Sequence, residues 1–95
     1  MNDRAGGMPL YSIAVAAQLV ELQPATLRLY EEKGLLTPAR TEGGTRRYSE
    51  DDLALVRQVV RLQGDGINLA GIGRVLALEQ ENDELRRRLG RRPRR

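Results

Sequence analysis

Glycine and proline divide this chain into short segments, and their positions limit its fold more than any other feature of the sequence. Pro24 can start a helix, because the first helical position needs no N–H donor. Gly34 can end that helix in a left-handed conformation. Pro38 then prevents another helix from following directly, and Gly43-Gly44 favours a turn. The pattern predicts short helices interrupted by one small hairpin.

Two helices are expected before the hairpin. Leu10-Tyr11 is predicted as a short extended piece, and Ser12 is a good N-cap for a helix over residues 13–20. The second helix is predicted from Pro24 to about Lys33. Two short helices joined by a tight turn form a helix-turn-helix candidate, although many helical domains contain such a pair.

The hairpin is predicted to pair residues 36–41 with residues 45–48, which is stable only when packed on the helices. A third helix should follow, with Ser49 as its N-cap and Asp52 completing a capping box. Its apolar residues fall into two rows, Leu53, Val56 and Val60 in one and Leu55, Val59 and Leu62 in the other.

A fourth helix is expected after the glycines at 64 and 66, capped by Asn68 and running from Leu69 to about Leu78. Beyond it the apolar spacing becomes heptad-like, which is typical of a coiled coil. We expect this seam to dimerise the chain, although the same helix could instead fold back on its own domain. The predicted dimerisation residues are Val75, Leu78, Asn82, Leu85 and Leu89.

Composition excludes several classes of protein. The 95 residues contain no Cys and no His, which removes disulfides, thiolate nucleophiles, Ser-His triads and imidazole- or thiolate-based metal sites. We therefore expect no enzyme, no cofactor and no metal regulation. No apolar run approaches the ~20 residues of a membrane span, and the N-terminus lacks a signal-peptide pattern. These features predict a cytoplasmic location without membrane association.

Positive charge is concentrated at one end of the chain. Seven of the 16 basic residues are Arg within residues 86–95, where there is no acidic residue. The rest of the chain therefore has nine basic and 13 acidic residues, and its net charge is negative. The overall charge of +3 is therefore no argument that the folded domain binds nucleic acid. We expect a disordered basic tail, which could alternatively add non-specific phosphate contacts.

Helix, turn, helix, hairpin wing and helix is the order of a winged helix-turn-helix DNA-binding domain. Leu27 and Tyr30 of the second helix are predicted to point inward, which leaves Arg28 on the opposite edge to contact a phosphate or a guanine edge. The wing carries further basic side chains that are predicted to contact DNA, Arg40 on one arm and Arg46 and Arg47 on the other.

Five motifs occur within residues 11–53, Tyr11-Ser12-Ile13, Thr26-Leu27-Arg28-x-Tyr30-Glu31-x-x-Gly34-Leu35-Leu36, Pro38-x-Arg40, Gly44-x-Arg46-x-Tyr48-Ser49 and Asp52-Leu53, and two more follow, Asn68-Leu69-Ala70-Gly71-Ile72 and Leu76-x-Leu78-Glu79. With these motifs the chain resembles the N-terminal domain of MerR-family transcription regulators from Tyr11 to about Leu78. The last two motifs resemble more narrowly the heat-shock repressor branch called HspR. Two departures are Leu29, where many members have a tyrosine, and Thr45, where a wing aromatic is expected.

The resemblance implies a homodimeric repressor of heat-shock or chaperone genes that reads an inverted repeat in double-stranded DNA. It implies DNA contacts by Arg28 and Arg46, contacts near the start of the second helix by Gln23, Ala25 and Thr26, and a bracing role for Tyr48. It also implies a DnaK-type chaperone as co-repressor and no small-molecule ligand. The expected organisation is a flexible start (1–9), a DNA-binding domain (10–78), a dimerisation helix (79–89) and a basic tail (90–95).

Two other functions remain compatible with the residues. An excisionase-like architectural protein shares the winged fold and bends DNA for recombination. A coiled-coil adaptor without DNA binding would agree with Leu29 and with the negative charge of the chain outside its tail. Mapping of the DNA sites that the protein occupies distinguishes a repressor from an excisionase-like protein. A salt-dependent DNA titration distinguishes a repressor from a coiled-coil adaptor.

Overall fold

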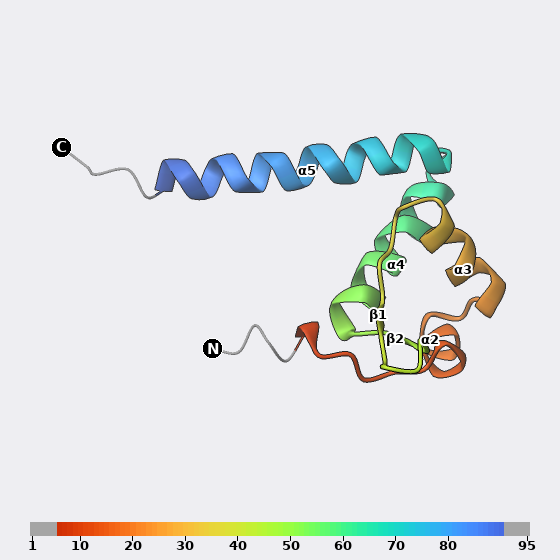
Figure 1. Cartoon of the computed structure of the whole chain (residues 1–95). Coiled ribbons are helices and arrows are strands. Elements are labelled where there is room, and N and C mark those ends of the chain that lie inside the picture. The colour runs from red at the N-terminus through yellow and green to blue at the C-terminus, as the bar shows by residue number, and fades with distance from the viewer. Residues whose placement is uncertain (1–5, 91–95) are drawn as a thin grey trace.

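The computed structural model describes residues 6–90 and is mainly helical, with one small hairpin, as predicted (Figure 1). The flexible start expected over residues 1–9 and the basic tail expected over 90–95 lie mostly outside the described residues. The elements are, in chain order, α2 (Ile13–Val20), α3 (Pro24–Glu32), β1 (Ala39–Arg40), β2 (Arg46–Arg47), α4 (Glu50–Gly64) and α5 (Leu69–Gly90).

The helix ends are set by the residues that the sequence indicated. The Ser12 hydroxyl accepts a hydrogen bond from the Val15 N–H (3.3 Å), and Pro24 is the first residue of α3. Gly34 follows α3 with a φ of +79°, a left-handed conformation that favours glycine. Ser49 and Asp52 form the predicted capping box at the start of α4, each side chain bonding the backbone of the other.

The core lies where α2, α3 and α4 meet, closed on one side by the start of α5 (Figure 1). The row predicted to include Val60 is partly wrong, because Val60 is 38% exposed whereas its neighbour Val59 is buried. The rotation of α4 that buries Leu53 and Val56 brings Val59, one helical turn further on, onto the same inner face. The buried apolar residues are Ala16, Ala17, Leu27, Tyr30, Leu35, Leu36, Tyr48, Leu53, Val56, Val59 and Ile72.

The wing is shorter than predicted, since only Ala39–Arg40 and Arg46–Arg47 pair, in antiparallel register. Pro38 has no N–H to donate and its side chain is buried, which limits the first arm. Tyr48 leaves the hairpin and forms an isolated antiparallel bridge with Tyr11, whose N–H donates to the Tyr48 carbonyl (2.9 Å). The extended piece predicted at Leu10-Tyr11 therefore holds the base of the wing.

The pieces expected as residues 69–78 and 79–89 are one continuous helix, α5, of 22 residues. Neither glycine nor proline interrupts residues 74–89, so the backbone has no reason to break there. The second half of α5 extends beyond the other helices (Figure 1). No helix in residues 6–90 is long and apolar enough to cross a membrane.

Candidate nucleic-acid interface

One face of α3 is free for a ligand because the other face is packed into the core. Leu27 and Tyr30 are buried, as predicted, and the Tyr30 hydroxyl donates to the Gln63 side chain of α4 (2.7 Å). Ala25 and Arg28 are exposed on the outer face. Arg28 therefore presents its guanidinium to solvent from the second helix of a helix-turn-helix, the position from which such proteins reach base edges.

The two other residues predicted near the start of α3 differ in exposure. Gln23 is the N-cap residue, but its side chain makes no capping hydrogen bond and is exposed. Thr26 is half-buried in the first turn. The first turn of a helix favours a phosphate oxygen through its unpaired N–H groups, but in α3 Pro24 has no N–H and the Thr26 N–H already donates to the Gln23 carbonyl (2.9 Å). Gln23, Ala25 and Arg28 are exposed at or near the first turns of α3, and Thr26 is partly exposed.

The wing is joined to α3 by a carboxylate that the sequence reasoning overlooked, Glu31. Its Oε1 accepts a hydrogen bond from Nε of Arg46 (2.6 Å), and its Oε2 accepts one from Nη2 of Arg40 (2.8 Å). Arg40 also donates through Nη1 to the carbonyl of Gly44 at the tip of the wing (2.9 Å). Two basic residues predicted to contact DNA are thus both paired with an acid of the helix beside them.

The remaining wing residues lie on different sides of the hairpin. Arg47 follows Arg46 directly, so its side chain points to the other face of the strand, and it makes no ion pair within residues 6–90. Tyr48 is fully buried, so it can affect DNA binding only by holding the wing in place. Burial raises the pKa of its hydroxyl, which has no hydrogen-bond partner within the described part of the chain.

The contact between Glu31 and the wing should be sensitive to acid. Pairing with Arg46 and Arg40 lowers the pKa of Glu31 below its ordinary value of 4.5, although partial burial opposes this. A carboxyl group with a lowered folded-state pKa stabilises the fold above its ordinary pKa, and that contribution is lost as the pH falls through the lowered value. We expect the amide resonances of Thr41 to Thr45 to shift below pH 4.5 in the wild type. The Glu31→Gln variant should lack this transition, and its persistence there would contradict the assignment to Glu31.

The predicted dimerisation residues lie on a face of α5 that does not pack on the domain. Ile72 and Leu76 contact the core, whereas Leu78, Leu85 and Leu89 are 51–60% exposed. Val75 is half-buried and Asn82 exposed. Spacings of three and four residues keep this row on one side of the helix. The structure contradicts the alternative that α5 folds back on its own domain, because every residue from Ala77 to Gly90 is exposed.

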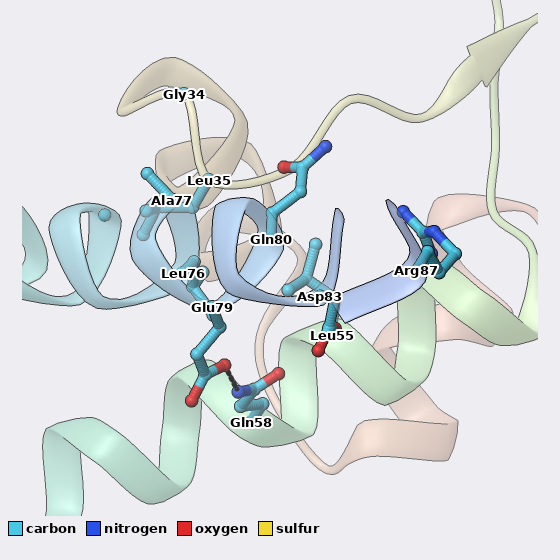
Figure 2. A pocket seen from close by; sticks show the side chains of 11 residues that line it. Gly34, Leu35, Leu55, Gln58, Leu76, Ala77, Glu79, Gln80, Asp83 and Arg87 are labelled. Carbon is cyan, nitrogen blue, oxygen red and sulfur yellow. Dashed lines mark hydrogen bonds between the residues drawn. The ribbon is translucent and has the colours of Figure 1, made fainter. Parts of the chain in front are cut away.

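A groove runs between α5, α4 and the loop after α3, next to the face of α5 that contacts the core (Figure 2). Leu35, Leu55 and Leu76 form its apolar part, and polar side chains of α5 such as Gln80 and Asp83 line the rest. Across it, Nε2 of Gln58 donates to Oε1 of Glu79 (2.8 Å), a bond between α4 and α5 that helps fix the direction of α5. No group of three or more carboxylates within residues 6–90 is arranged to hold a metal ion.

Comparison with known proteins agrees with this arrangement. Residues 11–79 match the family model described as "MerR HTH family regulatory protein". The chain belongs to the MerR family. The match includes α2, α3, the wing, α4 and the first half of α5, so it contains every residue discussed above as a DNA contact. The predicted family is confirmed.

Individual relatives support the heat-shock branch of the MerR family. The chain is 54% identical over 81 residues to a putative heat shock protein HspR of Streptomyces coelicolor, covering 84% of this chain and 54% of that protein. It is 32% identical to the regulator GlnR of Bacillus anthracis, covering 88% and 65%. The structure of HiNmlR, a MerR-family regulator lacking the sensor domain and bound to promoter DNA, superposes with a TM-score of 0.71 at 32% identity, covering 84% and 62%. The chain spans about half the length of its HspR relative.

Proposed function

We propose that this chain is a DNA-binding transcriptional repressor that acts as a homodimer on an inverted-repeat operator. The observation that carries the proposal is the exposed edge of α3, with Arg28 at its centre, beside a basic wing held against the same helix. A helix in the major groove and a wing along the backbone are how this architecture contacts DNA. HiNmlR, with the same fold, is bound to promoter DNA.

The regulated genes that we propose are those of the heat-shock response, including chaperones. Support comes from the 54% identity to the HspR relative, which is higher than the 32% identity to GlnR or HiNmlR. We further propose that a DnaK-type chaperone acts as co-repressor, an extension that rests on this similarity alone. A genome-wide binding map would test the first proposal, and a palindrome near chaperone promoters is the expected result. Sites clustered at a recombination locus would favour the excisionase-like alternative.

The proposal of a homodimer rests on the exposed apolar row of α5. An inverted repeat has two-fold symmetry, and a two-fold dimer places one recognition helix on each half-site. A repressor of this kind acts where the chromosome lies, so we propose a cytoplasmic location.

The assignment of α3 as the recognition helix predicts a large effect of Arg28→Ala on operator binding. Loss of a base contact should weaken specific binding by about 1–3 kcal/mol, with less effect on random DNA. Because Arg28 is exposed and unpaired within residues 6–90, the substitution should leave the melting temperature nearly unchanged. Titrations of both DNA types at several salt concentrations measure this. Unchanged operator affinity in a folded variant would remove α3 from the interface, and a wild type without salt-dependent DNA binding would favour the adaptor alternative.

A further inference from the structure

The guanidinium of Arg46 is held from one side only. Its Nε donates to Glu31, whereas Nη1 and Nη2 make no hydrogen bond to any residue from 6 to 90. These two nitrogens are not buried, since the one buried and unpartnered polar side-chain atom in that part of the chain is the Tyr48 hydroxyl. Arg46 therefore keeps its two terminal N–H groups toward solvent, in the geometry that binds a phosphate with two hydrogen bonds.

Arg40 differs from Arg46 in how its guanidinium is used. Its Nη2 donates to the other oxygen of Glu31, and its Nη1 donates to the carbonyl of Gly44. Each terminal nitrogen of Arg40 thus makes one hydrogen bond within the protein, while its side chain stays 44% exposed, against 27% for Arg46. Gly44 has a φ of +89° and lies at the tip of the wing, so Arg40 links that tip to α3. Arg46, on the opposite strand of the hairpin, bonds through Nε alone, so both of its terminal nitrogens lack a partner within residues 6–90.

We propose that Glu31 is a positioning residue that orients Arg46 toward a DNA phosphate, and that Arg40 is a structural residue of the wing rather than a DNA contact. The proposal rests on the proposed function, because it concerns how this chain would hold its wing on DNA. It differs from the expectation from sequence, in which Arg40, Arg46 and Arg47 all contact DNA.

The proposal gives Glu31→Gln an effect opposite to that expected from charge alone. Removing an acid near DNA should strengthen binding, because it removes repulsion from the phosphates. Glu32 provides the matched control, since it is the next residue of α3, is exposed and makes no ion pair within the described residues. Glu32→Gln should bind operator DNA about twofold more tightly. Glu31→Gln should bind it on the order of tenfold more weakly, because the neutral amide has one acceptor oxygen and cannot hold Arg46 and Arg40 together as the carboxylate does.

The salt dependence distinguishes positioning from a general loss of structure. Arg46→Ala should reduce the slope of log affinity against log salt by about one, and Glu31→Gln should reduce it by a similar amount. Combining the two substitutions should add little to either alone, because they remove the same phosphate contact. Arg40→Ala should leave the slope nearly unchanged.

Fluorescence titrations of a labelled operator fragment at four or more salt concentrations, with melting temperatures of each variant, test these expectations. Tighter binding by Glu31→Gln, like that of Glu32→Gln, would overturn the positioning role, and a reduced slope for Arg40→Ala would overturn the structural role of Arg40. If Glu31→Gln lowers the melting temperature, Arg46→Lys provides the second test. It retains the charge but lacks the second terminal nitrogen, so operator binding should be on the order of tenfold weaker, and equal affinity would overturn the proposal. Absence of salt-dependent binding by the wild type would instead reject the proposed function itself.

Discussion

Replacing Leu85 with aspartate should abolish cooperative occupancy of a two-half-site operator. Leu85 is 51% exposed in the middle of the apolar row of α5, where a partner helix would cover it. Each buried aliphatic side chain contributes roughly 1.5–3 kcal/mol to such a contact, and a two-fold dimer contains Leu85 twice. A carboxylate there would lose this contribution and would also have to be desolvated. The helix itself should persist, since Leu85 contributes nothing to the core.

Sedimentation of the free protein and titration of DNA with one or two half-sites measure this effect. Ala77→Asp is the matched control, because it introduces the same charge at an exposed position of α5 that borders the groove rather than the apolar row. The control should dimerise like the wild type. We expect the wild-type dimer itself to be weak, because Asn82 interrupts the row, and to be strengthened by palindromic DNA. A dimer that persists at nanomolar concentration would contradict the expectation of a weak contact between the α5 helices. Binding of a monomer to a single half-site would contradict the expectation of a dimer on DNA.

Replacing Tyr48 with alanine should lower the free energy of unfolding by about 3–5 kcal/mol, as is typical of large aromatic residues in a core. Tyr48 is fully buried, and its backbone joins the wing to Tyr11. For a chain of this size the change corresponds to a fall in melting temperature of more than about 12 °C. Urea or thermal unfolding followed by circular dichroism measures it.

Tyr48→Phe separates the packing of the ring from its hydroxyl. The hydroxyl is buried and has no partner within residues 6–90, so its removal relieves a desolvation cost. We expect the phenylalanine variant to be at least as stable as the wild type and to bind DNA equally well. A marked loss of stability in Tyr48→Phe would show that the hydroxyl is bonded, and a small effect of Tyr48→Ala would show that the ring is not part of the core.

The local features of the fold could be predicted from the sequence because they depend on residues close together in the chain. The caps at Ser12 and Ser49 each bond an N–H three residues away. Pro24 and Gly34 bound α3 through their own backbone preferences. The inward-facing residues of α3 follow from the helical period, which also placed Arg28 on the outer face. Element order, the bounds of α2 and α3, the start of α4 and the exposed edge of α3 were therefore predictable.

The pairing of Arg40 and Arg46 with Glu31 was not predictable, because it joins residues far apart in the chain. Arg40 and Arg46 have the same charge and both lie in the hairpin, so sequence treats them alike. Glu31 lies nine and fifteen residues before them, and no periodicity links an acid of a helix to a strand. The one signal for this pairing in the sequence was an acidic residue on a helix that was expected to face DNA.

The length of the wing and the course of α5 were likewise settled by packing. The hairpin of the wing has fewer paired residues at its base than predicted, because the buried Tyr48 pairs with Tyr11 instead of continuing the hairpin. Leu76 packs against the core, whereas Leu78 is exposed. Both lie on apolar faces of α5, and the packing of α5 against α4 determines which of the two faces is buried. Sequence thus determined which segments are helical and where they begin, since those energies are local. Which charged and apolar side chains meet was determined by the assembled helices, since those energies require the elements to be in place.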